Sequence, residues 1–196
     1  MILASGSPQR RAILEQLGVA FEVVVTDVDE LETGEPEEIA VENARRKAVA
    51  GAAATPKDSG AAATGPLASS TVLGVDTVVA LDGRIYGKPL DFDDAVATLR
   101  ALAGNSHRVV SGICVIEGAV ARTATAVTEV NFRPLSAAAI AWYVDTGEWE
   151  GRAGGYAIQG CGAALVESIH GDYLNVVGLP VATLLDLLPS LLFSAI

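Results

Sequence analysis

The sequence has few cysteines, few histidines and few basic residues, and each shortage excludes a class of protein. Its 196 residues include two cysteines, Cys114 and Cys161, which cannot form a disulfide framework. The two histidines, His107 and His170, have no metal-ligand spacing, so we interpret both as surface or structural residues. Lys and Arg number 13 against 24 Asp and Glu, for a net charge of -11. A field of this sign repels DNA, RNA and anionic membranes, so we expect neither polymeric nucleic acid nor membrane partners.

The sequence also lacks Walker A, CxxC and GxSxG motifs, and it has no apolar run long enough to cross a bilayer. Its last sixteen residues are apolar but are interrupted by Asp186 and Pro189. The first residues form an apolar run too short for a signal peptide, without a basic region before it. Together with the low cysteine content, these features predict a cytoplasmic protein.

What is present is an alternation of apolar strand patterns and amphipathic helix patterns, which predicts a mixed-sheet α/β fold. We expect strands at 1–5, 21–25, 70–81, 84–87, 107–117, 119–132 and 153–169. We expect helices at 8–17, 36–53, 91–104, 136–143 and from 180 onward. Asp91 or Asp93 would cap the third helix. An Ala-, Gly-, Ser- and Pro-rich stretch at about 55–70 is interpreted as a flexible insertion within a single domain, 1–196.

The stretch "MILASGSPQRR" predicts a strand, a turn of small residues and a helix start. Ser7 is a candidate N-cap and Pro8 suits the first helical position. Backbone N–H groups at such a helix start can hold a phosphate, with Ser5, Ser7 and Arg10 as further donors. The alternative is a capped helix whose arginines are simply solvated.

Asp76 interrupts the apolar strand "GVDTVVAL". A buried carboxylate is costly unless it is paired, and no basic residue stands beside it in the sequence, so a hydrated cation or an attacking water is a candidate partner. A structural Asp satisfied by the fold is the alternative. Lys47 in a basic run, Lys88 on a stiff Gly-Lys-Pro loop and Glu30 in an acidic run are weaker candidates when each is taken alone.

Seven stretches together give a more specific indication. They are "LASGSPQRR", "VDE" at 28–30, "ENARRKA", "GVDTVVALDG", "YGKP", "YVDTGEWEGRAGGYAIQG" and "GDYLNVVGLP". In this order and spacing, and over nearly the whole chain outside 55–70, they resemble the Maf family of nucleotide pyrophosphatases.

The resemblance implies a two-lobed α/β fold, with a mixed twisted sheet, flanking helices and a deep cleft, like that of inosine triphosphate pyrophosphatases. It implies hydrolysis of a nucleoside triphosphate to the monophosphate and pyrophosphate with Mg²⁺ or Mn²⁺, and a homodimer. By the same resemblance, Asp76 is the general base, Glu30 and Asp76 hold the metal, and the polyphosphate is bound by Ser5, Ser7, Arg10, Lys47 and Lys88.

The same resemblance bears on the base. Thr77 and Gln159 match positions that mark the branch acting on dTTP and UTP. Gln9 departs from the pattern, because the family often has an arginine at this position, which is linked to base choice. Two alternatives therefore stay open: an enzyme for non-standard nucleotides such as 7-methyl-GTP or inosine triphosphate, and a non-catalytic nucleotide-binding regulator of cell division.

Overall fold

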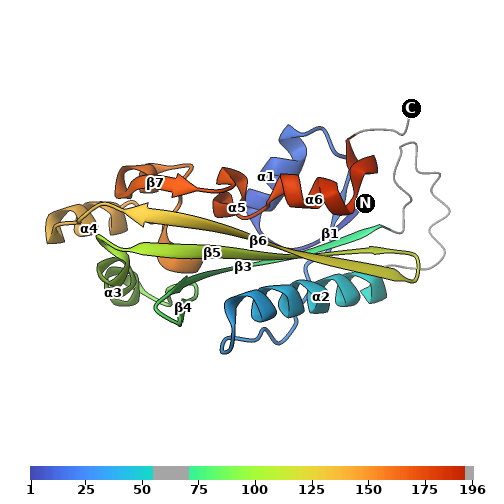
Figure 1. Cartoon of the computed structure of the whole chain (residues 1–196), viewed down its shortest axis with the longest axis horizontal. Helices are drawn as coiled ribbons and strands as arrows, with labels where there is room; N and C mark the ends of the chain where they lie inside the picture. Colours follow the sequence, from blue (N-terminus) through green and yellow to red (C-terminus); the bar gives the residue numbers. More distant parts are fainter. Residues whose placement is uncertain (55–70, 193–196) are drawn as a thin grey trace.

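The computed structural model describes residues 1–54 and 71–192, which fold into a twisted seven-stranded sheet with helices on both faces (Figure 1). The strands are β1 (Ile2–Ala4), β2 (Glu22–Val23), β3 (Val72–Leu81), β4 (Arg84–Tyr86), β5 (Ser106–Glu117), β6 (Val120–Phe132) and β7 (Val166–His170). The helices are α1 (Pro8–Gln16), α2 (Pro36–Ala54), α3 (Phe92–Leu102), α4 (Ala137–Val144), α5 (Tyr173–Val177) and α6 (Val181–Leu187). The strand order is β2-β1-β3-β5-β6-β7, and β4 pairs with β3 outside this path. Since β1 is parallel to its neighbours and the other pairs are antiparallel, the predicted mixed α/β fold is confirmed.

Helix α2 packs closely on one face of the sheet because two glycines leave room for its backbone. A methyl group added at Gly74 of β3 would lie 2.2 Å from the carbonyl oxygen of Ala44. One added at Gly112 of β5 would lie 2.2 Å from the carbonyl group of Ala40. Only glycine permits so close an approach, so side chains that α2 directs toward the sheet reach β3 directly.

The opposite face of the same half of the sheet is covered by α1 and α6. Their Leu14 and Leu184 pack with Leu3 of β1 and Val75 of β3 in a buried apolar cluster. Since successive strand residues point to opposite faces, β3 directs Gly74, and therefore Asp76, toward α2, and Val75 toward α1 and α6.

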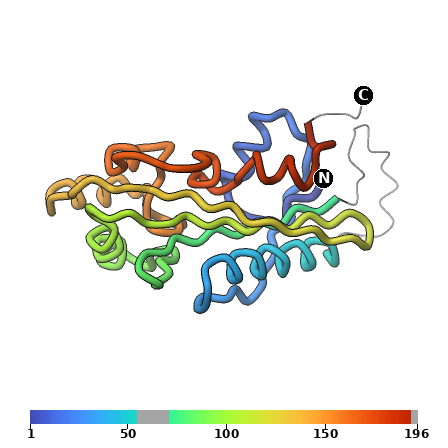
Figure 2. The backbone as a smooth tube through the Cα atoms, viewed as in Figure 1, coloured from blue at the N-terminus to red at the C-terminus, as the bar shows by residue number. Residues whose placement is uncertain are grey.

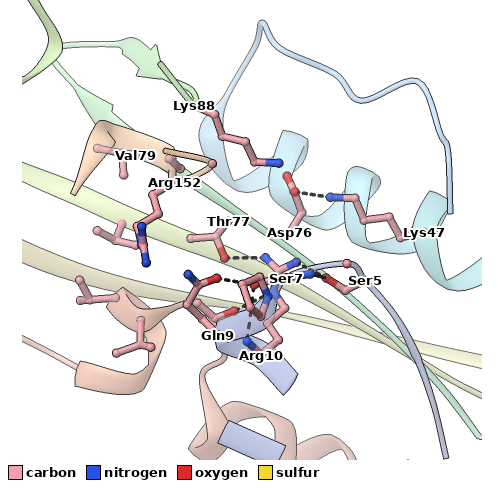
Figure 3. Close-up of a pocket in the computed structure, with 18 of the residues that line it drawn as sticks. Ser5, Ser7, Gln9, Arg10, Lys47, Asp76, Thr77, Val79, Lys88 and Arg152 are labelled. Carbon is pink, nitrogen blue, oxygen red and sulfur yellow. Dashed lines mark hydrogen bonds and ion pairs between the residues drawn. The ribbon is translucent and has the colours of Figure 1, made fainter. Parts of the chain in front are cut away.

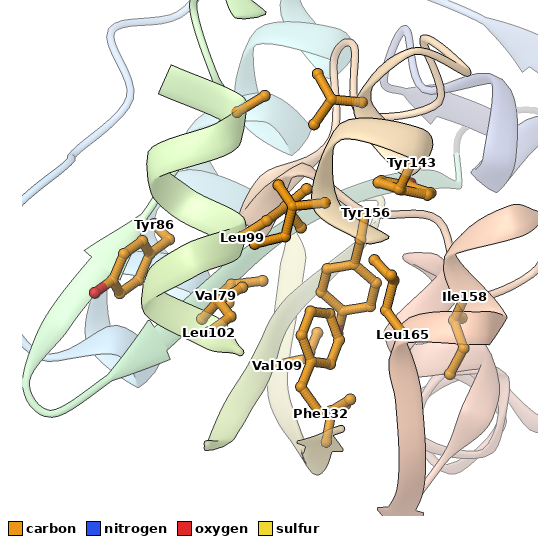
Figure 4. Close-up of a cluster of buried hydrophobic side chains, with 14 residues drawn as sticks. Val79, Tyr86, Leu99, Leu102, Val109, Phe132, Tyr143, Tyr156, Ile158 and Leu165 are labelled. Atoms are coloured by element: carbon orange, nitrogen blue, oxygen red, sulfur yellow. The ribbon is translucent and has the colours of Figure 1, made fainter. Parts of the chain in front are cut away.

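A second cluster fills the other end of the molecule, beneath α3, α4 and the chain that follows α4. It includes Leu99, Phe132, Tyr143 and Tyr156 (Figure 4). Strand β5 supplies residues to both clusters and, with β6, runs along most of the molecule (Figure 2). The two halves of the fold therefore share one continuous hairpin.

One edge of β3 is paired at both ends and open in the middle. Strand β1 pairs with its residues 72–74 and β4 with its residues 79–81. Within the described chain, no strand pairs with 75–78 on this edge. The interruption leaves Asp76 and Thr77 on an unpaired stretch of the same edge, with their side chains on opposite faces of the sheet.

The stretch predicted as a strand at 153–169 is wrong over most of its length. It forms two 3-10 turns, Ala153–Gly155 and Cys161–Leu165, before β7 begins at Val166. Gly154 and Gly155 have φ values of 69° and 64°, which no strand accommodates. The strand expected at 21–25 is confined to Glu22–Val23.

Other boundaries can be compared with the structure in the same way. Asp91, not Asp93, caps α3 by accepting a hydrogen bond from the backbone N–H of Asp94. The short helix α5 was not predicted. The insertion expected at 55–70 lies outside the described residues. Among the helices that are described, none combines the length and the apolar character needed to cross a bilayer.

Candidate active site

All ten side chains that the sequence singled out line one cavity of about 470 Å³ at the open edge of β3 (Figure 3). They are Ser5, Ser7, Gln9, Arg10, Glu30, Lys47, Asp76, Thr77, Lys88 and Gln159. They come from six separate parts of the sequence, and the fold brings them together because β1, β3, β4 and α2 all meet at this edge.

The start of α1 forms one wall of the cavity. Ser7 is the N-cap, as predicted, and its hydroxyl accepts from the backbone N–H of Arg10. The same hydroxyl donates to the side-chain carbonyl oxygen of Gln9 at 3.0 Å. The amide nitrogen of Gln9 takes no part in this hydrogen bond. The wall therefore combines hydroxyl and amide groups with the positive end of the helix dipole.

Arg10 is buried and connects three parts of this wall. Its Nε donates to the carbonyl of Gly178 at 2.9 Å, its Nη1 to Ser5 Oγ at 2.9 Å and its Nη2 to Thr77 Oγ1 at 3.1 Å. Burial lowers the pKa of the guanidinium, and the charges of Asp76 and Glu30 oppose this shift. A guanidinium has further N–H groups beyond these three contacts, so Arg10 can hold the wall together and still donate into the cavity.

Asp76 lies on the α2 side of the edge, and its two carboxylate oxygens have different partners. Oδ1 is 2.6 Å from Lys47 Nζ, and Oδ2 accepts from the side-chain amide of Asn43 at 3.1 Å. Only 5% of Asp76 and 8% of Lys47 are exposed. The basic partner that is missing from the sequence around Asp76 is thus supplied by a helix 29 residues away.

Lys47 also contacts Glu30, whose Oε1 is 2.9 Å from the same ammonium. Two carboxylates therefore converge on one cation. Within residues 1–54 and 71–192 there is no group of three or more His, Cys, Asp or Glu that could enclose a metal by itself. Magnesium is commonly held by one or two carboxylates together with substrate phosphates, so the oxygen donors of Asp76 and Glu30 fit that ion.

The side of the β3 edge that faces away from α2, where Thr77 lies, is less charged. Thr77 Oγ1 lies 2.8 Å from Ser111 Oγ, its neighbour on β5, as well as accepting from Arg10. Gln159 reaches the cavity from the turns that follow α4, and apolar surface comes from Val79 and Val176. A ring with polar edges and apolar faces suits this mixture of groups.

Lys88 follows β4 and is exposed, and it forms no ion pair within the described residues. Figure 3 shows its ammonium pointing toward Asp76. It therefore adds an uncommitted positive charge at the mouth of the cavity.

Sequence reasoning did not single out two further residues at this site. Arg152 lines the cavity on the same side as Thr77 and Gln9 (Figure 3), and its Nη1 donates to the backbone carbonyls of Glu148 and Glu150. Asn43 is buried beneath the cavity and contacts Asp76. Both stand within stretches already quoted, but nothing in the local sequence separates them from their neighbours.

The remaining residues with reactive side chains lie away from this chemistry. His107 is buried and structural, with its Nε2 2.9 Å from the hydroxyl of Tyr156. Cys114 is a buried core residue, and Cys161 is exposed. Of the two arginines after Gln9, Arg11 is the solvated one and pairs with Glu15.

The chain is similar to known proteins over nearly its whole length. The family model described as "Maf-like protein" matches residues 1–191. A dTTP/UTP pyrophosphatase of Pyrococcus furiosus is 41% identical over 192 residues, covering 96% of this chain and 93% of the relative. One of Nitratidesulfovibrio vulgaris is 47% identical over 193 residues, covering 96% and 86%. One of Symbiobacterium thermophilum is 43% identical over 182 residues, covering 92% and 88%.

Proposed function

Because the chain belongs to the Maf family, and because its relatives named above are dTTP/UTP pyrophosphatases, we propose that it hydrolyses dTTP and UTP to the monophosphate and pyrophosphate. The observation that carries the proposal is the convergence of the buried Asp76 with separate cationic side chains in one cavity.

The charges in the cavity suit a triphosphate although the whole molecule is acidic. Its charged lining consists of four cationic side chains, Arg10, Lys47, Lys88 and Arg152, and two carboxylates, Asp76 and Glu30. A local excess of positive charge of this kind can bind an anion that the net charge of -11 otherwise repels. Ser5, Ser7 and the N–H groups at the start of α1 add uncharged donors for phosphate oxygens.

Hydrolysis of the α–β phosphoanhydride requires a water positioned next to the α-phosphorus. Asp76 is the group that can orient and deprotonate this water, because its carboxylate reaches the cavity from a rigid central strand. Lys47 and Lys88 stabilise the negative charge that develops on the departing pyrophosphate. Asp76 and Glu30 would hold Mg²⁺ or Mn²⁺, which supplies Lewis-acid polarisation of the phosphate oxygens when it is bound.

The nucleobase belongs on the other side of the edge, with Thr77, Gln9 and Gln159. The amide of Gln159 can both donate and accept, as the edge of uracil or thymine requires. A base with a different pattern leaves these polar groups unpaired, which lowers its rate of turnover. Gln9 supplies an amide where the family often has an arginine, and it can contact the base in the same manner.

Pyrophosphate release with Mg²⁺ or Mn²⁺, measured over dTTP, UTP, CTP, 7-methyl-GTP and inosine triphosphate, tests the proposal. We expect dTTP and UTP to have the highest kcat/KM. Asp76→Asn keeps the shape of the side chain and should lower kcat by about 100-fold or more, within the range that general-base catalysis contributes. Full activity in this variant would show that Asp76 is not the general base.

The same panel separates the alternatives. Preferred hydrolysis of 7-methyl-GTP or inosine triphosphate would assign the protein to the clearance of non-standard nucleotides. Nucleotide binding without pyrophosphate release, with either metal, would favour a non-catalytic regulator.

A further inference from the structure

Asn43 of α2 uses its single side-chain amide for three hydrogen bonds. Its oxygen accepts from the backbone N–H of Leu31 at 2.7 Å, and its nitrogen donates to the carbonyl of Leu31 at 3.0 Å. The same nitrogen donates to Asp76 Oδ2 at 3.1 Å. Both N–H groups of the amide are therefore used, and with 1% of the residue exposed the side chain has one possible orientation.

The contacts with Leu31 hold a segment that has no regular structure of its own. Residues 24–35 contain neither helix nor strand, and this segment carries Glu30 to the cavity. Three side chains from adjacent turns of α2 attach it: Asn43 through Leu31, Arg46 through the carbonyl of Asp29 at 2.7 Å, and Lys47 through Glu30. Asn43 is the one that binds both backbone groups of a single residue and so fixes the path of the chain.

The contact with Asp76 fixes the rotation of its carboxylate. Lys47 holds Oδ1 and Asn43 holds Oδ2, so neither oxygen can turn away without losing a hydrogen bond in a buried environment. A general base has to be aimed at its water to be effective, and an error of even a small rotation lowers the rate.

From these contacts we propose that Asn43 is a positioning residue that couples the Glu30 segment to Asp76, so that the two carboxylates face the substrate together. The proposal rests on the function proposed above. Asn43 acts through its neighbours and does not itself line the cavity.

Two substitutions test the coupling in different ways. Asn43→Asp keeps the size of the side chain and the acceptor for the Leu31 N–H, but it replaces both donors with a carboxylate oxygen that repels Asp76. Asn43→Ala removes all three contacts. We expect Asn43→Asp to lower kcat for UTP by about 100-fold and Asn43→Ala by about 10-fold or more, with KM changed by less than about threefold, because orientation of the base affects the chemical step.

A matched control separates positioning from general loss of stability. Leu184→Ala truncates a fully buried side chain in the α1–α6 cluster, away from the cavity. Assayed well below its melting temperature, it should keep the wild-type kcat. If Asn43→Asp also keeps the wild-type kcat, or if its loss appears in KM alone, the proposal is overturned.

The coupling itself is tested by combining Asn43→Ala with Glu30→Gln. Residues that act as a unit give non-additive losses of activity. Asn43→Ala should therefore lower kcat for UTP by a clearly smaller factor in the Glu30→Gln background than in the wild type. Independent, fully additive losses would contradict the proposal.

One readout does not depend on turnover. The Leu31 amide should exchange its hydrogen slowly in the wild type and at least about tenfold faster in Asn43→Ala, because it loses its acceptor. An unchanged exchange rate of the Leu31 amide in Asn43→Ala would contradict the proposal that Asn43 fixes the 24–35 segment. If the wild-type protein releases no pyrophosphate, the proposed function fails, and this exchange measurement still decides whether Asn43 holds the segment.

Discussion

At the scale of single residues, Arg152 gives the clearest prediction about base choice. A guanidinium only donates hydrogen bonds, and uracil and thymine present a carbonyl oxygen where cytosine has an amino group. Arg152 lies on the Thr77 side of the cavity, so Arg152→Gln should lower kcat/KM for UTP by about 10- to 100-fold, as expected for losing a hydrogen bond from a charged group. The loss with CTP should be smaller. The measurement is kcat/KM for both nucleotides.

The control for this prediction is Arg122→Gln, which removes an arginine that pairs with Glu117 on the β5–β6 hairpin and does not line the cavity. It should leave both values unchanged. Equal losses with UTP and CTP in Arg152→Gln would place Arg152 against the phosphates instead of the base.

Residues at the site differ in how far the sequence could predict them. Asp76 was predictable because a carboxylate within an apolar strand needs a partner, and Ser7 because an N-cap acts on its own helix. Lys47 stands in a basic run, and without the family resemblance it could not be separated from Arg45 and Arg46 until α2 was placed on the sheet. Asn43 could not be predicted at all, because its main partner is the backbone of Leu31. Every residue has the same backbone groups, so the sequence does not indicate which of them a side chain will bind.

At the scale of elements, the approach of α2 to the sheet predicts a large effect for one methyl group. In Gly112→Ala the new carbon would meet the backbone of Ala40, which cannot move aside as a flexible side chain would. We expect a loss of at least about 3 kcal/mol in the free energy of unfolding, at the upper end for overpacked sites. Activity should fall too, because α2 carries Lys47. Denaturant unfolding with an activity assay measures both effects.

Gly87→Ala is the comparison for this prediction, since an added methyl group at Gly87 meets no atom within 4 Å. Its free energy of unfolding should stay within about 0.5 kcal/mol of the wild type. Similar losses in the two variants would mean that the closeness of α2 to the sheet is not what stabilises the fold.

The elements themselves show where sequence patterns succeed and fail. The apolar periodicity of 36–53 and the long alternating pair that became β5 and β6 predicted their structures to within a few residues. The strand predicted for the glycine-rich run at 153–169 was wrong over most of its length. The apolar residues of this run are typical of a strand, but Gly154 and Gly155 adopt left-handed conformations that turn the chain. Which conformation a glycine takes depends on its packing, and the local sequence does not specify it.

At the scale of the whole molecule, the position of the site follows from an interruption in pairing. Strand β3 pairs with β1 over one part and with β4 over another, and the cavity lies at the gap between them. The sequence indicated the α/β class and the residues, but it could not indicate this gap, because the gap depends on which distant strands share an edge. At the gap, the side chain of Asp76 lies on the face of the sheet that α2 covers and that of Thr77 on the opposite face.

Stability of the whole fold should depend on pH through one buried side chain. His107 is 1% exposed, packs edge-on against Phe132 and Tyr156, and has no partner for its Nδ1 among the described residues. Burial lowers the pKa of His107 from 6.5 to about 4. The unfolded chain therefore binds a proton at higher pH than the folded one, so the stability held above pH 6.5 is lost as the pH falls toward 4.

The loss from His107 over this range should be about 3 kcal/mol, because each pKa unit corresponds to about 1.4 kcal/mol. Urea unfolding at pH 7, 5.5 and 4 measures it, and His107→Gln isolates it, since glutamine does not titrate. The variant should be less stable than the wild type at pH 7, because the contact with Tyr156 is altered, but the difference between the two proteins should shrink steadily toward pH 4. Carboxylates with lowered pKa values, such as Glu42 beside its arginines, act in the same direction in both proteins and cancel in the comparison. A difference that is constant from pH 7 to 4 would show that the pKa of His107 is the same in the folded and the unfolded chain, and the burial of an uncharged His107 against Phe132 and Tyr156 would then be wrong as described.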